Sequence, residues 1–164
     1  MVNWLGEIVQ EHIHPDDTVL DLGCGIMQGT DDLKCKSLLG VDIWSTYLNN
    51  IKHLHPTVKM GMDETYRFMD NSYDVVICLD VVEHLEKELA LRVLDECKRI
   101  CRKKAIVYTP DHFDENTQPP EGAWGLGDNP LQTHRCVIAK VELRTRKYHV
   151  TNPISEGWFG VHDK

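Results

Sequence analysis

The sequence has 164 residues, of which 41% are hydrophobic, enough for a single domain (residues 1–164) with one sizeable core. Its formal net charge of −8 argues against a broad electrostatic surface for nucleic acid and favours a small molecule as partner. No run approaches the ~18 apolar residues of a membrane span, and the first residues lack the basic start and apolar core of a secretion signal, so we expect a cytoplasmic protein with no membrane partner.

The six cysteines indicate neither a metal site nor a disulfide framework. None of them forms a Cys-x-x-Cys pair, and several lie inside apolar runs, where a free thiol behaves as a small hydrophobic side chain. We therefore expect free thiols and a reducing compartment, which agrees with the cytoplasmic location.

The first predicted element is a short helix that ends before Pro15. Apolar residues recur on one of its faces at Trp4, Leu5, Ile8, Val9 and Ile13. A helix this short gives little cover to a neighbouring ligand site.

A glycine-rich turn follows the next element, a short apolar strand over residues 19–22. Gly23, Gly25 and Gly29 allow a tight turn in which the backbone can touch a ligand, although an ordinary strand-to-helix turn has the same pattern. Asp42 closes a second apolar run nineteen residues after Gly23, close to the roughly 20 expected for a carboxylate that binds ribose hydroxyls. The spacing predicts an adenosine ligand.

Asp21, two residues before the first glycine, discriminates between adenosine cofactors. A dinucleotide places a pyrophosphate against such a turn, and a carboxylate would repel it by about 1 kcal/mol if well solvated and by ~4 kcal/mol at partly buried range. S-adenosylmethionine carries a sulfonium and an ammonium and no phosphate. Asp21 therefore favours S-adenosylmethionine over a nicotinamide dinucleotide.

Residues 43–54 and 57–60 predict a helix and then a short strand. The helix has Tyr47, Leu48, Ile51 and Leu54 at helical spacing. Trp44 at its start either stacks on an adenine or packs in the core.

Asp63 follows the short strand. It has two interpretations, as an acceptor for an adenine amino group or as an ordinary helix N-cap.

The apolar run over residues 73–79 shows little alternation, which is typical of a strand in the middle of a parallel sheet. Asp80, Glu83 and His84 follow it directly. One interpretation is a capping arrangement, in which Asp80 and Glu83 begin a helix with an apolar stripe from Leu85 to Cys101. Two others are catalytic: His84 acts as a general base, or Glu83 and His84 bind a divalent ion with a downstream His.

These motifs together resemble a class I S-adenosylmethionine-dependent methyltransferase, of the small single-domain kind. Asp21-Leu-Gly-Cys-Gly25 resembles the first motif of that family, Gly-Val-Asp42 the second, Met62-Asp63 the third and the run from Tyr73 to Asp80 the fourth. The resemblance implies that the methionine end lies against Asp21 and the glycine backbone, the ribose at Asp42, the adenine at Asp63 and the floor of the site at Leu79-Asp80. The cofactor-binding candidates are Asp21, Gly23, Cys24, Gly25, Asp42, Ile43, Met62, Asp63, Leu79 and Asp80.

The Asp80–His84 segment is also similar to small-RNA 2′-O-methyltransferases and ubiquinone-pathway O-methyltransferases, whose Glu-x-x-Glu-His segment holds a metal. Here Asp80 stands at the first position. We expect no metal, and Glu83 and His84 are the candidates if one is bound.

A fifth strand over residues 105–110 ends at a proline, and residues 111–133 form a long polar loop. Irregular segments of this length in a compact domain are usually functional, so we expect an acceptor or lid loop. Its candidate contacts are His112, Phe113, Trp124, His134 and Arg135. The catalytic candidates of the whole chain are His84, His112 and His134.

Residues 137–144 predict a last helix, and residues 147–151 and 157–162 predict two strands. The resemblance implies a three-layer, Rossmann-like, doubly wound α/β sheet that is mostly parallel and ends in an antiparallel hairpin. Lys98, Arg99, Arg102, Lys103 and Lys104 form a basic cluster, which we interpret as a solvated helix end rather than an RNA contact.

The sequence thus predicts methyl transfer from S-adenosylmethionine to an oxygen, carboxylate or carbon of a small molecule. The Asn/Asp-Pro-Pro-Tyr signature that the family uses for amino groups on bases is absent after Leu79. Two alternatives remain, a nicotinamide-dependent oxidoreductase on the same strands and a cofactor-binding partner subunit without activity of its own. The scant cover over the site also suggests a homo-oligomer or a partner subunit.

Overall fold

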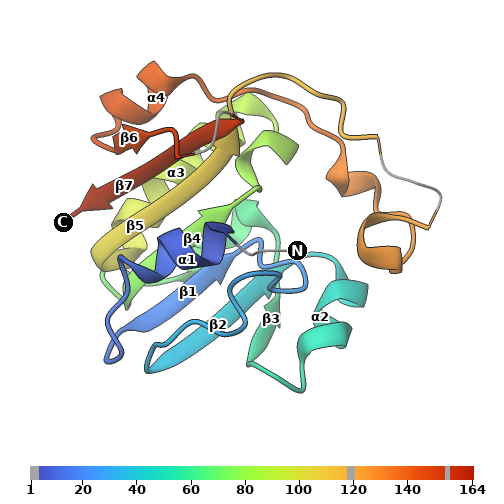
Figure 1. Ribbon diagram of the computed structural model, residues 1–164, viewed down its shortest axis with the longest axis horizontal. Coiled ribbons are helices and arrows are strands. Elements are labelled where there is room, and N and C mark those ends of the chain that lie inside the picture. The colour runs from blue at the N-terminus through green and yellow to red at the C-terminus, as the bar shows by residue number, and fades with distance from the viewer. Residues whose placement is uncertain (1–3, 118–120, 154–155) are drawn as a thin grey trace.

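The strands of the protein form one mixed sheet (Figure 1). The computed structural model describes residues 4–117, 121–153 and 156–164, and the strands within these ranges lie in the order β3-β2-β1-β4-β5-β7-β6. Their bounds are β1 (Thr18–Leu22), β2 (Ser37–Asp42), β3 (Thr57–Lys59), β4 (Tyr73–Leu79), β5 (Cys101–Pro110), β6 (His149–Thr151) and β7 (Gly157–Asp163). Strands β1 to β5 are parallel, and β7 runs antiparallel to β5 and β6. Because the strand order reverses between β1 and β4, the carboxyl ends of these strands flank the crevice where open α/β sheets bind ligands.

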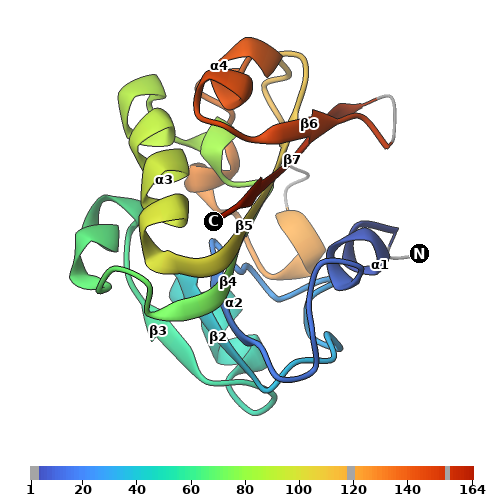
Figure 2. The same ribbon diagram turned by 90° about the vertical axis from the view of Figure 1, so that its left-hand side faces the viewer.

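Helices cover both faces of the sheet, with α1 and α3 on opposite sides (Figure 2). They are α1 (Trp4–Gln10), α2 (Ser45–Ile51), α3 (Lys87–Ile100) and α4 (Lys140–Thr145). Val19 and Leu20, successive residues of β1, belong to different buried clusters, one shared with α2 and the other with α3 and α4. The predicted three-layer, doubly wound sheet with a C-terminal antiparallel hairpin is therefore confirmed. Among the described helices, none has both the length and the apolar character needed to cross a bilayer.

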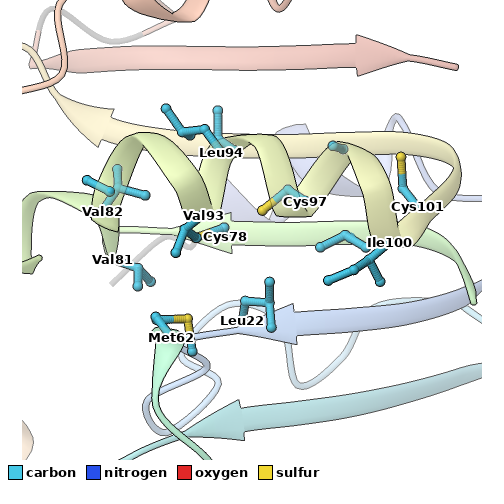
Figure 3. Close-up of a cluster of buried hydrophobic side chains, with 14 of the residues drawn as sticks. Leu22, Met62, Cys78, Val81, Val82, Val93, Leu94, Cys97, Ile100 and Cys101 are labelled. Atoms are coloured by element: carbon cyan, nitrogen blue, oxygen red, sulfur yellow. The ribbon is translucent and has the colours of Figure 1, made fainter. Parts of the chain in front are cut away.

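The longest helix, α3, packs over β4 and β5 with one apolar face (Figure 3). Val93, Leu94, Cys97 and Ile100 recur at helical spacing and are each 0% exposed. All six cysteines are free, as predicted, and Cys97 packs in this core as a small hydrophobic side chain.

The segment between β4 and α3 differs from the prediction. Asp80 follows β4 in the left-handed region with φ of +52°, and Val82–His84 then forms the 3₁₀ turn η2. Helix α3 begins only at Lys87, and the side chain of the preceding Glu86 does not cap it. The predicted capping arrangement of Asp80 and Glu83 is therefore wrong, because the turn directs the Glu83 side chain into the protein, where it is 2% exposed.

Two connections also depart from simple α/β units. The crossover from β1 to β2, residues 23–36, consists of turns without a helix, in keeping with its short length. Helix α2 ends at Ile51, so Leu54, predicted on its buried face, lies beyond the helix and is 54% exposed.

The acceptor loop expected at residues 111–133 lies between β5 and α4. Its regular structure is limited, within the described residues, to the 3₁₀ turns η3 (Ala123–Gly125) and η4 (Pro130–Gln132). Residues 118–120 of this loop fall outside the described ranges.

The basic cluster is largely engaged within the protein. Lys103 and Lys104 lie on β5 rather than on α3. Lys103 pairs with Asp17 and Asp74, and Lys104 pairs with Asp163. The acidic partners offset the charge that these two lysines contribute.

Candidate active site

A cavity of about 740 Å³ opens at the carboxyl ends of β1, β2 and β4. Its size is in the range of small-molecule and cofactor sites. Its walls come from the turn after β1, the ends of β2 and β4, the start of the 3₁₀ turn η1 (Met62–Arg67), the turn η2 and the returning part of the acceptor loop. The lining also includes Leu5 and Gly6 of α1, Leu89 of α3, Pro110 at the end of β5 and Asn116 in the first part of the acceptor loop.

The glycine turn after β1 is fixed against the sheet. The amides of Gly23 and Cys24 both donate to the carbonyl oxygen of Val41, at 2.8 and 2.9 Å. Gly23 has φ of +76°, and a methyl group in place of its hydrogen would lie 2.3 Å from Val81. Only glycine fits this position, because both the backbone conformation and the contact exclude a side chain.

Asp21 lines the cavity and is 3% exposed. One of its carboxylate oxygens accepts a hydrogen bond from the Thr30 hydroxyl at 2.7 Å. Burial and, to a smaller extent, the nearby Asp42 raise the pKa of Asp21 to about 7, although the Thr30 hydrogen bond lowers it. A buried carboxyl with little compensation is suited to a cationic ligand.

Asp42 is held at the tip of β2 by two backbone amides. Its two oxygens accept from Gly25 at 2.9 Å and from Trp44 at 2.7 Å. Burial raises the pKa of Asp42, and these hydrogen bonds partly oppose the increase. Each oxygen keeps a further lone pair for a ligand hydroxyl.

Glu83 and Asp80 form a pair of carboxyl groups, of which Glu83 is buried and Asp80 faces the cavity. Glu83 accepts from the Thr109 hydroxyl at 3.2 Å through Oε2, while its Oε1 is buried without a donor. Burial, followed by the charge of Asp80, raises the pKa of Glu83 well above its usual range. Asp80 faces the cavity and is exposed there, yet the surrounding protein raises its pKa to about 6. Because burial and mutual repulsion disfavour two negative charges at this place, Glu83 holds a proton more readily than Asp80 does.

Two imidazoles lie beside Glu83. The rings of His84 and His134 meet edge to face with their centroids 4.8 Å apart. Burial and then the neighbouring His134 lower the pKa of His84 to about 4, and burial also lowers the pKa of His134. Both imidazoles are therefore neutral at neutral pH. One ligand atom from each of Glu83, His84 and His134 lies within 4.8 Å of the others, which is a spacing that can hold a metal ion.

Backbone hydrogen bonds hold His134 next to His84 and Glu83. The amides of Arg135 and Cys136 donate to the carbonyl oxygen of Glu83 at 2.7 and 3.1 Å. Farther back in the loop, the Asn116 side chain donates to the Gln132 carbonyl at 2.8 Å. The end of the acceptor loop is thus attached directly to η2.

Trp124 attaches the middle of the loop to the opposite wall. Its indole N–H donates to Gln28 at 2.5 Å, and its ring meets Tyr47 edge to face at 5.0 Å. The indole also lies above the glycine turn, where a methyl group at Gly25 would be 3.1 Å from it. Loop and turn therefore form one wall of the cavity.

The match to known proteins agrees with this geometry. A family model described as a methyltransferase domain matches residues 20–109, which is more than half of the chain. The chain belongs to the S-adenosylmethionine-dependent methyltransferases. The match runs from within β1 to within β5 and therefore includes the carboxyl ends of β1, β2 and β4, where the cavity opens.

Solved structures share the fold of this methyltransferase at low sequence identity. Magnesium protoporphyrin IX methyltransferase from Synechocystis PCC 6803, with bound S-adenosylmethionine, is 13% identical with a TM-score of 0.68, and the alignment covers 99% of this chain and 79% of that one. The PH0226 protein from Pyrococcus horikoshii OT3 is 18% identical with a TM-score of 0.71, at coverages of 97% and 87%. Small RNA methyltransferase HEN1 is 16% identical with a TM-score of 0.65, at coverages of 98% and 25%. No curated protein matches the sequence when sequences are compared directly.

The cavity of the methyltransferase gathers most of the residues that the sequence singles out. All ten cofactor-binding candidates line it, as do His84 and His134. His112 does not: it is exposed and its Nδ1 contacts Asp111 at 2.9 Å. Arg135 pairs with Glu86 outside the cavity, and Trp44 is also not part of the lining.

Several lining residues escape prediction from the sequence. Thr30 and Gln28 lie on the turn after β1, and Asn129, Leu131 and Gln132 lie on the acceptor loop. These positions share no local pattern. Only the length and polarity of the loop indicate that some part of it reaches the site.

Proposed function

We propose that this methyltransferase transfers the methyl group of S-adenosylmethionine to a hydroxyl oxygen of a small molecule. The observation that carries this proposal is the continuity of the cavity. A cofactor half, lined by Asp21, Gly25, Asp42 and Asp63, opens into an acceptor half, lined by Glu83, His84, Leu131 and His134.

In the cofactor half, charge and backbone geometry suit the parts of S-adenosylmethionine. The buried Asp21 carboxyl complements the cationic methionine end, which lies against the glycine backbone. Asp42 is held in place to accept from ribose hydroxyls. Met62 and Asp63 border the adenine, and Leu79 and Asp80 form the floor.

In the acceptor half, the main contribution to catalysis is the positioning of the acceptor oxygen against the methyl group. Methyl transfer is an in-line displacement that needs the acceptor oxygen about 3 to 3.5 Å from the methyl carbon. Neutral His84 or His134 accepts a hydrogen bond from the acceptor hydroxyl and takes its proton as the new bond forms. Because the lowered pKa of His84 makes it a weak base, we assign the larger share of proton removal to His134.

A divalent cation is a second candidate for activating the hydroxyl. Oε1 of Glu83 and Nδ1 of His84 are buried without hydrogen-bond partners, and together with His134 they form a carboxylate and imidazole donor set. These three side chains would hold the ion. When bound, it would act as a Lewis acid that lowers the pKa of the acceptor hydroxyl.

Calorimetry tests the cofactor assignment. We expect S-adenosylhomocysteine to bind and NADH not to bind, because Asp21 disfavours a pyrophosphate. Tight binding of NADH with no binding of S-adenosylhomocysteine would favour the oxidoreductase instead. A screen of small hydroxylated compounds with labelled methyl donor tests turnover, and cofactor binding with turnover only in the presence of a second chain would favour the partner-subunit alternative.

Substitution of the histidines distinguishes a role as general base from a role as metal ligand. His134→Ala is expected to lower kcat by about 10²-fold, the usual contribution of a general base. If the histidines instead hold a metal, the same variant loses Mg²⁺ or Mn²⁺ binding in a calorimetric titration, and chelation of the wild type lowers activity to the same degree. His112→Ala, outside the cavity, serves as the control and is expected to leave both readouts unchanged.

A further inference from the structure

The walls of the cavity carry acidic side chains but no lysine or arginine within the described ranges. Five acidic residues line it: Asp21, Asp42, Asp63, Asp80 and Glu83. No Lys or Arg lines it within the described ranges, and none of the residues outside those ranges is Lys or Arg in the sequence.

The cations nearest to the acceptor half along the chain are engaged elsewhere. Arg135, adjacent to His134, pairs with Glu86 at 3.1 Å. Lys87 donates to the Val137 carbonyl oxygen and pairs with Glu142 at 2.6 Å. Neither side chain is part of the cavity lining.

Apolar side chains supply several walls of the acceptor half. Leu85 and Leu89 come from the η2 and α3 side, and Leu131 and Pro110 come from the acceptor loop and the end of β5. These apolar side chains accommodate a hydrophobic body. The polar side chains around them are the uncharged Asn116, Asn129 and Gln132 of the acceptor loop, together with Asp80, His84 and His134.

We propose that the methyl acceptor is an uncharged or cationic molecule with an apolar body, and that the cavity rejects compounds that carry a carboxylate or a phosphate near the reacting hydroxyl. The inference rests on the proposed function, since it concerns the acceptor half of the same cavity. An anion entering this half would lose its hydration and gain no cationic partner, while facing the carboxyl groups at Asp80 and Glu83. The proposal limits the class of acceptors to small molecules without a negative charge. It also excludes a nucleic-acid backbone from the cavity, because that backbone carries phosphates.

A matched series of phenols tests the charge preference. 4-Ethylphenol, tyramine and 4-hydroxyphenylacetate share a phenol ring and similar size but are neutral, cationic and anionic. Each is titrated by calorimetry or NMR into the full chain saturated with S-adenosylhomocysteine, once with EDTA and once with millimolar Mg²⁺. We expect the neutral and cationic compounds to bind at least about tenfold more tightly than the anion.

Several results would overturn the proposal. Equal or tighter binding of 4-hydroxyphenylacetate in either condition would contradict the exclusion of anions. Failure of all three phenols to bind to the saturated protein would contradict the apolar acceptor half. Failure of S-adenosylhomocysteine itself to bind would instead contradict the proposed function, so the two failures are distinguishable.

A charge-introducing variant sharpens the test. Gln132 lines the acceptor half, and Gln132→Lys supplies the missing cation without changing Asp80 or Glu83. We expect the variant to reverse the ranking, so that 4-hydroxyphenylacetate binds more tightly than tyramine. Val141→Lys is the matched control, because Val141 lies on α4, is 62% exposed and does not line the cavity. An unchanged ranking in Gln132→Lys, with the variant folded and cofactor bound, would also contradict the proposal.

Discussion

The cofactor half and the acceptor half of the cavity are built from different kinds of structure. The cofactor half consists of strand tips and a glycine turn. Amides of this turn donate to the Val41 carbonyl oxygen and to the Asp42 carboxylate, which fixes the turn against the end of β2. The acceptor half joins η2 to a loop segment fifty residues farther along the chain. A ligand shared by all members of a family can be held by the sheet itself, whereas a ligand that varies is held by the segment that is easiest to change.

The strongest test of this difference compares two glycines with positive φ. Gly23→Ala is expected to lower the free energy of unfolding by about 3 kcal/mol, roughly 1 for the left-handed backbone and about 2 for the clash with Val81. Gly127→Ala, in the acceptor loop at φ of +93° with open space around it, should cost only about 1 kcal/mol. Urea denaturation of both variants gives the comparison, and equal losses would mean that the turn after β1 is no more constrained than the loop.

The next effect concerns the charge at Asp21. Asp21→Asn keeps the size of the side chain and removes the carboxylate, so the affinity for S-adenosylmethionine should fall roughly 30-fold, equivalent to about 2 kcal/mol for a lost charge-assisted contact. S-adenosylhomocysteine, which lacks the sulfonium, should lose less. Isothermal titration with both ligands measures the difference, with Leu54→Ala as an exposed control, and identical losses would exclude a specific role in recognising the sulfonium.

Titration of Asp21 predicts a pH dependence of the same interaction. Burial raises its pKa to about 7 in the free protein, so at lower pH a proton must leave before the cationic cofactor can bind. The affinity for S-adenosylmethionine should therefore rise about fifteenfold between pH 5.5 and pH 7, as the ionised fraction increases. Asp42 and Asp80 face the same cavity and also have raised pKa values, so Asp21→Asn should flatten most of the profile but not all of it. A wild-type affinity independent of pH over this range would contradict the prediction.

The smallest effect is expected in the loop. Trp124→Phe removes the indole N–H that donates to Gln28, a hydrogen bond worth about 0.5–1 kcal/mol. Amide hydrogen exchange in residues 124–134 should accelerate roughly threefold while the urea midpoint stays unchanged, because the loop opens without global unfolding. Trp158→Phe, at a tryptophan that packs under Lys140, is the control. Equal exchange in both variants would show that the loop is held by other contacts.

The parts of the molecule that sequence reasoning predicts best are those with local signals. The strand over residues 73–79 is a continuous apolar run because both faces of β4 are covered, and the glycines after β1 mark a turn that only glycine can make. Asp21 and Asp42 follow from their spacing to that turn. Each of these features is determined by a few neighbours in sequence.

The acceptor half could not be predicted in the same way. A carboxylate at Asp80 followed by Glu83 has the appearance of a capping box, and only the left-handed backbone at Asp80 shows that Glu83 points inward toward Thr109. His84 and His134 meet because the loop returns to bond the backbone of Glu83. No periodicity in the sequence encodes such a return, because it depends on contacts between segments that are distant along the chain.

The attachment of the loop at both ends has a consequence for changing the substrate of this protein. The amide of Asp111 donates to the carbonyl oxygen of Glu156 at one end, and the amides of Arg135 and Cys136 donate to that of Glu83 at the other. All of these anchors are main-chain groups, which every amino acid except proline can supply in full. A loop of different sequence would therefore be anchored at the same two points. Replacement of the residues between these anchors is the most direct way to engineer a new acceptor specificity, because it leaves the cofactor half unchanged.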